Sequence, residues 1–67
     1  MIENNLSVVI GKKKLTISEV SKIAGIKYDT VKSLYYGRTK GIEFETLNRL
    51  CFALECTPGD IFKYVED

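Results

Sequence analysis

The feature that most constrains this fold is a pair of short amphipathic segments joined by only three residues. The segments span residues 17–24 and 28–36, and in each the apolar side chains recur every three or four positions, as on one face of a helix. The residues predicted to face inward are Ile17, Val20, Ile23, Ala24, Val31 and Leu34. The connection is Gly25-Ile26-Lys27. Two short helices joined so tightly are expected to meet at a steep angle.

The residues at the ends of these segments support the same interpretation. Thr16 precedes the first segment and Glu19 follows three positions later, which is the pattern of a capping box: each side chain accepts a hydrogen bond from the other residue's backbone N–H. Gly25 and Gly37 follow the two segments, and glycine readily adopts the left-handed conformation that ends many helices. The sequence therefore predicts a helix-turn-helix corner at Gly25.

Three further helices are predicted around this corner. The first covers residues 2–10 and ends at Gly11. A helix over 44–54 carries the strongest periodicity, in the apolar set Phe44, Leu47, Leu50, Cys51 and Leu54. The last begins at Thr57-Pro58, where threonine caps the helix and proline occupies its first position. Its apolar side chains are expected to pack on the core: Ile61, Phe62 and Val65. With no strand or linker predicted, residues 1–67 are expected to form one compact, all-α, five-helix domain.

Composition excludes several classes of function. No apolar stretch approaches the ~20 residues that span a bilayer, and the N-terminus has no basic-then-apolar leader, so a cytoplasmic location without membrane association is expected. Two cysteines and no histidine are too few for a disulfide framework or a zinc site. Cys51 is expected to be buried and Cys56 more exposed. Because the chain has no plausible nucleophile–base pair and no glycine-rich phosphate loop, we expect no catalytic residue, metal, cofactor or small-molecule ligand.

Charge is divided unevenly along the chain. Residues 11–40 contain eight Lys or Arg and two acidic residues, a balance of +6, whereas residues 41–67 have a balance of −4. The net charge is only +1. A nearly neutral chain with one strongly basic half is typical of a protein that binds a polyanion such as nucleic acid.

The stretch from Ile17 to Gly37, with the sequence ISEVSKIAGIKYDTVKSLYYG, resembles the Cro/cI-type (XRE) helix-turn-helix family of phage and bacterial repressors. The positions that match the family pattern are Val20, Gly25, Ile26, Val31, Leu34 and Gly37. Residues 42–54 and 57–62 resemble the following two helices of that family. The resemblance therefore extends from about Leu6 to Val65.

Three positions depart from the family pattern. Ser21 stands where a small alanine is usual, and Lys27 stands where a serine or threonine cap is usual. Ile17 replaces a glutamine that often contacts phosphate in relatives, so Thr16, Ser18 or a backbone N–H would have to make this contact.

The resemblance implies sequence-specific binding of double-stranded DNA by a transcriptional regulator, a repressor, with residues 28–36 as the recognition helix in the major groove. The base-reading candidates are Lys27, Tyr28, Asp29, Lys32 and Ser33. Lys32 can donate to guanine O6 or N7, and Asp29 can accept from cytosine N4. The phosphate-contact candidates, which position the protein without reading sequence, are Thr16, Ser18, Arg38, Thr39 and Lys40.

Several alternatives stay open at this stage. Asp29 can serve only to stabilise the helix dipole, Tyr35 and Tyr36 can belong to the core, and Lys12–Lys14 can be either a solvated loop or a phosphate contact. The fold can also act as a protein-interaction module or an antitoxin-like partner-binding protein. Relatives commonly bind palindromes as homodimers. We therefore expect a homodimer whose interface lies in the C-terminal half, with Phe62, Tyr64 and Val65 as candidates.

Overall fold

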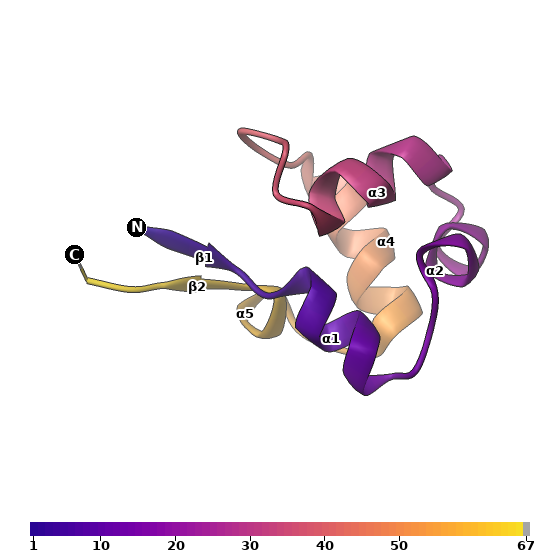
Figure 1. Cartoon of the computed structure of the whole chain (residues 1–67), viewed down its shortest axis with the longest axis horizontal. Helices are drawn as coiled ribbons and strands as arrows, with labels where there is room; N and C mark the ends of the chain where they lie inside the picture. Colours follow the sequence, from indigo (N-terminus) through magenta and orange to yellow (C-terminus); the bar gives the residue numbers. More distant parts are fainter. Residues whose placement is uncertain (67) are drawn as a thin grey trace.

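A computed structural model describes residues 1–66, which form five helices and two short strands. The helices are α1 (Leu6–Lys12), α2 (Ile17–Ala24), α3 (Tyr28–Tyr35), α4 (Phe44–Leu54) and α5 (Pro58–Ile61). The strands are β1 (Ile2–Asn4) and β2 (Phe62–Tyr64). Figure 1 shows the helices gathered into one body, from which the two strands project together as a ribbon along the long axis of the molecule. None of these helices is long and apolar enough to cross a membrane.

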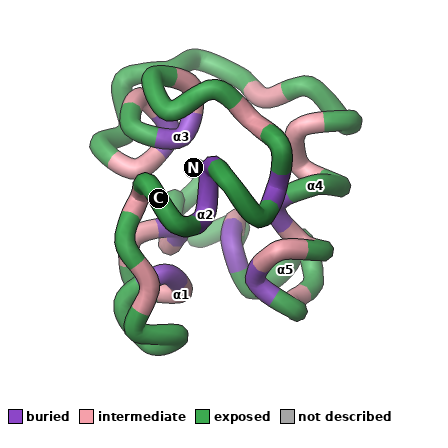
Figure 2. Tube along the Cα trace, turned by 90° about the vertical axis from the view of Figure 1, so that its right-hand side faces the viewer, coloured by how far each residue is buried: buried purple, intermediate pink, exposed green. Residues whose placement is uncertain are grey.

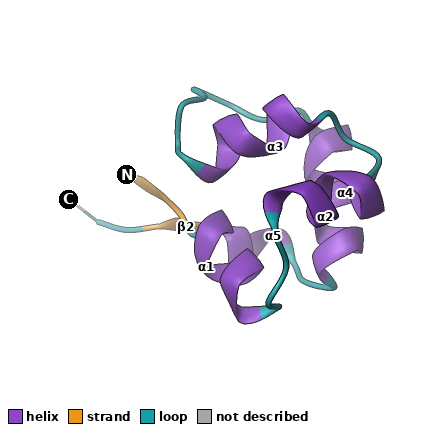
Figure 3. Ribbon diagram, turned by 45° about the vertical axis from the view of Figure 1, so that its right-hand side comes forward, coloured by secondary structure: helices purple, strands orange, loops and turns teal. Residues whose placement is uncertain are grey.

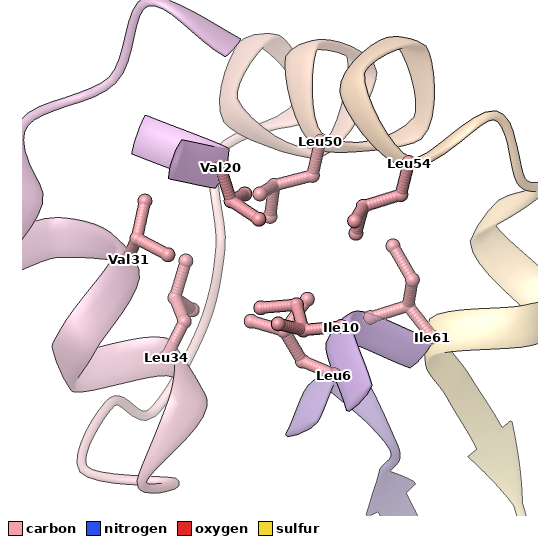
Figure 4. Packing of buried hydrophobic residues seen from close by; sticks show 8 residues of the cluster. All are labelled: Leu6, Ile10, Val20, Val31, Leu34, Leu50, Leu54 and Ile61. Atoms are coloured by element: carbon pink, nitrogen blue, oxygen red, sulfur yellow. The ribbon is translucent and has the colours of Figure 1, made fainter. Parts of the chain in front are cut away.

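The hydrophobic core draws on all five helices (Figure 4). Its eight buried apolar side chains are Leu6 and Ile10 of α1, Val20 of α2, Val31 and Leu34 of α3, Leu50 and Leu54 of α4, and Ile61 of α5. The buried positions all lie on helices, and most of the chain trace is exposed (Figure 2). A chain of this length buries only about 60% of its unfolded surface. Each helix is therefore needed to complete the core.

The predicted capping box at Thr16 is confirmed, whereas the Thr57 side chain makes no capping bond to the backbone of the last helix. The backbone N–H of Glu19 donates to Thr16 Oγ1 at 3.1 Å, and the backbone N–H of Thr16 donates to Glu19 Oε1 at 2.9 Å. At α5, Asp60 Oδ2 accepts from the backbone N–H of Thr57 at 2.9 Å. This bond to the backbone, with a second from the Thr57 hydroxyl, lowers the pKa of the Asp60 carboxyl because both stabilise its charged form.

The prediction for the N-terminal segment is wrong in two respects. Ile2–Asn4 is a strand rather than the start of a helix, and α1 begins only at Leu6 and continues through Gly11 to Lys12. The strand forms because β1 pairs antiparallel with β2, with Ile2 opposite Tyr64. Because β2 lies near the other end of the chain, the local spacing of apolar residues around Ile2–Asn4 cannot indicate this pairing. The fold is mostly helical with a two-stranded sheet, not all-α.

The apolar faces also differ from the prediction at three positions. Phe44 is 87% exposed, Ile23 is 51% exposed and Val65 is 41% exposed, although all three were assigned to the core. Phe44 is the first residue of α4, and the side chains of α4 that pack on the core begin one turn later, at Leu47. The last predicted helix is shorter than expected as well, because the chain turns into β2 at Phe62.

Asn4 links β1 to the start of α1, which follows it in the sequence, and to the end of α3, which lies 30 residues away. Its Nδ2 donates to the Leu34 carbonyl near the end of α3 at 2.8 Å, and its Oδ1 accepts from the Leu6 N–H at the start of α1 at 2.9 Å. The first four N–H groups of a helix lack partners within the helix, so Asn4 satisfies one of these at α1, and at α3 it adds a second hydrogen bond to a carbonyl that also accepts from the Gly37 N–H. It thereby fixes the ribbon against α1 and α3.

Asn4→Ala is expected to lower the free energy of unfolding by about 1–3 kcal/mol, because it removes two hydrogen bonds worth roughly 0.5–1.5 kcal/mol each. Urea denaturation followed by circular dichroism measures this change. Asn4→Asp keeps the acceptor for Leu6 but turns a carboxylate oxygen towards the Leu34 carbonyl, so we expect a loss at least as large. Asn5→Ala is the neighbouring control, because the Asn5 side chain makes no capping bond to α1. An equal loss in Asn5→Ala would contradict the role assigned to Asn4.

Candidate nucleic-acid interface

The connection between α2 and α3 is a tight corner at residues 25–27. Gly25 ends α2 in the left-handed conformation, with a φ of 68°, and its N–H donates to the Ser21 carbonyl. The Ile26 N–H donates to the same carbonyl at 3.0 Å. In Figure 1, α2 is seen almost along its axis while α3 lies across the view, so the two helices meet at a steep angle. A residue other than glycine is disfavoured at position 25 because of this positive φ.

Arg49 of α4 supports this corner, a role that the sequence did not predict. Its Nη1 lies 3.4 Å from the Ala24 carbonyl and 3.5 Å from the Gly25 carbonyl, so the guanidinium reaches the carbonyl groups at the end of α2. Its Nε forms an ion pair with Glu45 at 2.9 Å, which holds the side chain in place. The Glu45–Arg49 spacing was visible in the sequence as a helical i,i+4 pair. Its contact with α2, however, depends on the packing of α4 against that helix.

Helix α3 separates an apolar side from a polar side. Val31 is fully buried and Leu34 is 3% exposed, as predicted. Four of the five predicted base-reading residues are exposed: Lys27, Tyr28, Asp29 and Lys32. The fifth, Ser33, is half-buried. Lys27 is at the N-cap position and its side chain makes no capping bond. The structure therefore brings all five residues onto or directly before one helix.

The two tyrosines at the end of α3 have different surroundings. Tyr35 is half-buried and packs against the core, whereas Tyr36 is 56% exposed. Their rings meet edge to face, with centroids 4.9 Å apart. Tyr36 also carries the Arg38 guanidinium over its ring, at 5.1 Å from the centroid, a favourable cation–π arrangement. Of the two, Tyr35 is the one that belongs to the core.

The segment after α3 places positive charge at the end of that helix. Gly37 has a φ of 68°, and the Arg38 N–H donates to the Ser33 carbonyl at 2.9 Å, so the chain turns back directly after α3. The predicted phosphate contacts Arg38, Thr39 and Lys40 are all exposed. Cations at this position also complement the negative end of the helix dipole.

The start of α2 holds the other two predicted phosphate contacts. Thr16 and Ser18 are both exposed. The Thr16 Oγ1 accepts the capping hydrogen bond from the Glu19 N–H, so this hydroxyl would bind a phosphate by donating its own proton. Ile17, where relatives often carry glutamine, is half-buried and packs against the core. Ser21 is buried and its hydroxyl donates to the Ser18 carbonyl at 2.8 Å, so α2 accommodates serine there without an unpaired polar group.

The basic connector between α1 and α2 lies away from α3. Figures 1 and 3 both show it on the opposite side of the helical body. Lys12 and Lys13 line an open hollow of about 340 Å³ that also borders α5 and β2.

Cys56 lies in this hollow, and burial, together with the nearby Cys51 thiol, raises its pKa to about 11. At neutral pH Cys56 is therefore a thiol and a poor nucleophile. Both cysteines are half-buried: Cys51 packs against the core as expected for the apolar face of α4, but it is not completely buried.

A tight corner, a following helix with a polar outer side and a basic segment behind it form the arrangement expected of a helix-turn-helix DNA-binding domain. Residues 5–67 match the model of the Cro/C1-type HTH DNA-binding domain, so the chain belongs to this family and the resemblance drawn from its sequence is confirmed. A relative in Bacillus subtilis (strain 168), the uncharacterized HTH-type transcriptional regulator YozG, is 40% identical over 63 residues. The alignment covers 94% of this chain and 75% of YozG.

Proposed function

We propose that this protein is a transcriptional repressor that binds specific sites on double-stranded DNA, with α2 and α3 as its helix-turn-helix. The observation that carries this proposal is the exposed polar side of α3, which follows the Gly25 corner and precedes Arg38 and Lys40. Membership of a DNA-binding family and the similarity to YozG, which is named as a transcriptional regulator, support it. A regulator of this kind would act in the cytoplasm, where bacterial DNA is found.

In this proposal α3 is the recognition helix and lies in the major groove. The residues at its N-terminal end contact base edges, as in other helix-turn-helix proteins. Lys32 donates to guanine O6 or N7 and Asp29 accepts from cytosine N4. Lys27, Tyr28 and Ser33 complete the set, with Ser33 limited to close contacts because it is half-buried.

Phosphates on either side of the groove are contacted from two directions. Thr16 and Ser18 reach one strand from the start of α2, where backbone N–H groups also attract anions. Arg38, Thr39 and Lys40 reach the backbone from the segment behind α3. These contacts orient α3 without reading sequence.

The protein is proposed to bind DNA as a homodimer on a two-fold symmetric site. Two copies present two recognition helices, and half-sites in such complexes are about one helical turn, roughly 34 Å, apart. A pure protein-interaction role is less well supported, because a docking module has no need of the cations that surround the corner. Catalysis is not proposed, since the family is one of DNA-binding domains.

The test is fluorescence anisotropy of a labelled duplex at several salt concentrations, first with random sequence and then with a selected site. On the selected site, Lys32→Ala is expected to lose about 1–3 kcal/mol of binding free energy and to relax the base preference at one position. Lys13→Ala removes the same charge on the opposite side of the molecule, and we expect it to leave affinity nearly unchanged. Absence of binding even at low salt, or an equal loss in both variants, would overturn the proposal.

A further inference from the structure

The turn after α4 brings the two cysteines of the chain together. Glu55 follows α4 in the left-handed conformation, with a φ of 51°. The Cys56 N–H donates to the Cys51 carbonyl at 3.1 Å, and the Glu55 N–H donates to the Phe52 carbonyl at 3.4 Å. These two hydrogen bonds define a Schellman motif, in which the side chains of the first and last residues are commonly in contact. In this turn those two residues are Cys51 and Cys56.

The two thiols meet in the folded protein. A hydrogen bond joins the Cys51 and Cys56 side chains, and both side chains pack against the hydrophobic core. A disulfide requires Cα atoms about 4.4–6.8 Å apart and side chains that point towards each other. Because the backbone hydrogen bond between the two residues holds their main chains together, the turn is already arranged for a bridge between them.

Small molecules can reach this pair through the hollow of about 340 Å³ beside α1. Of the two cysteines, Cys56 is the one that lines the hollow. The charged side chains around it nearly balance, so the hollow repels neither anions nor cations strongly. These side chains are Lys12, Lys13, Lys63, Glu55 and Asp60. Cys56 is therefore the thiol that a small reagent contacts first, and Cys51 is its neighbour.

We propose that Cys51 and Cys56 form a redox-dependent modification site, which low-molecular-weight disulfides of the glutathione class convert to an intrachain disulfide. In the first step the Cys56 thiolate attacks one sulfur of the reagent, its S–S bond breaks, and the released thiolate takes up the proton that Cys56 lost. In the second step the Cys51 sulfur, after losing its proton, attacks the Cys56 sulfur of the mixed disulfide. A second reagent thiolate leaves and takes up that proton. The two protein thiols are oxidised, and one reagent disulfide is reduced to two thiols.

The surroundings of Cys56 make this exchange slow at neutral pH. Burial, the Cys51 thiol and the Asp60 carboxylate raise the pKa of Cys56, and the nearby Lys13 opposes them. Since the thiolate is the attacking species, few Cys56 side chains are ready to react at any moment. Brief exposure to a disulfide reagent therefore leaves the pair reduced, whereas sustained oxidation of the small-thiol pool converts it.

The bridge fixes the turn between α4 and α5. Leu54 and Ile61, which lie on either side of this turn, are both buried in the core. Oxidation therefore ties together two parts of the core that are joined by a short loop. The hollow lies on the side of the molecule opposite α3, so the bridge leaves the exposed side of α3 unchanged. The inference does not depend on the proposed function.

Equilibration of the full chain with mixtures of reduced and oxidised glutathione tests the site. After acid quenching, mass spectrometry is expected to show a monomeric protein lighter by ~2 Da, the mass of the two hydrogens lost. The equilibrium constant for bridging is expected to be at least about tenfold larger in the folded protein than in concentrated urea, because the native turn holds the thiols together. Cys51→Ser is expected to stop at the mixed disulfide between Cys56 and glutathione. Cys56→Ser is expected to form its mixed disulfide more slowly.

The matched control moves one thiol by a single position along α4, in the double variant Cys51→Ala and Phe52→Cys. Position 52 is 76% exposed, so the number of thiols is kept while one of them leaves the core side of α4. Circular dichroism checks that the variant keeps its helices, and we expect no preference for bridging in its folded state. The comparison of the unmodified chain with and without urea does not depend on this variant. The inference is overturned if the folded chain takes up glutathione without bridging, or if its equilibrium constant is no larger than in urea. Equal bridging by the folded control would overturn it as well.

Discussion

Replacing Arg38 and Lys40 together with alanine is expected to weaken DNA binding about 60-fold at 0.1 M salt and to reduce the slope of log affinity against log salt by about 1.8. Each phosphate contact releases counterions and contributes about 0.9 to that slope, and two contacts are lost. Both side chains are exposed on the segment directly after α3, so their removal leaves the core untouched. Anisotropy titrations between about 50 and 200 mM salt measure the slope for the double variant, which is compared with the slope for the unmodified protein.

The matched control is the double variant Lys12→Ala and Lys13→Ala. It removes two positive charges as well, but from the hollow on the opposite side of the molecule. We expect a small change in affinity from the altered net charge and an unchanged base preference. An equal reduction of the slope in the two double variants would show that the DNA contacts extend beyond the α3 side, contrary to the proposed binding mode.

Leu50→Ala is expected to lower the free energy of unfolding by about 2–5 kcal/mol. Leu50 is fully buried and projects from α4 towards the other side chains of the core (Figure 4). Truncation removes apolar contacts and leaves a cavity that neighbouring side chains fill only in part. In a domain of this size each kcal/mol corresponds to roughly 4–8 °C in Tm. We therefore expect a fall of at least about 8 °C, or loss of the folded state.

Phe52→Ala on the same helix is the control that separates the effect of burial on stability from the effect of side-chain size. It removes a larger side chain, but Phe52 is 76% exposed, so the expected change in stability is within about 0.5 kcal/mol. Thermal and urea denaturation of the two variants should therefore differ widely. Similar losses would mean that α4 does not turn its Leu50 side towards the core.

The parts of the fold predicted correctly depend on residues close together in the chain. The bounds of α4, the capping box at Thr16 and the left-handed Gly25 each rest on interactions within a few positions. Burial of Val31 and Leu34 followed from helical periodicity, and family membership followed from the register of these residues around the corner. The base and phosphate contacts remain predictions, although all of the residues involved except half-buried Ser33 are exposed.

The sequence alone therefore determined the helical class, the corner and the DNA-binding family, because short-range hydrogen bonds and periodic burial leave a local pattern. Tertiary structure alone decided that Ile2–Asn4 is a strand, that Phe44 is exposed, and that Arg49 and Asn4 hold the ends of α2 and α3. Each of these depends on a partner far along the chain or on where the core ends. Such partners become neighbours only when the helices pack, and no local pattern in the sequence specifies them.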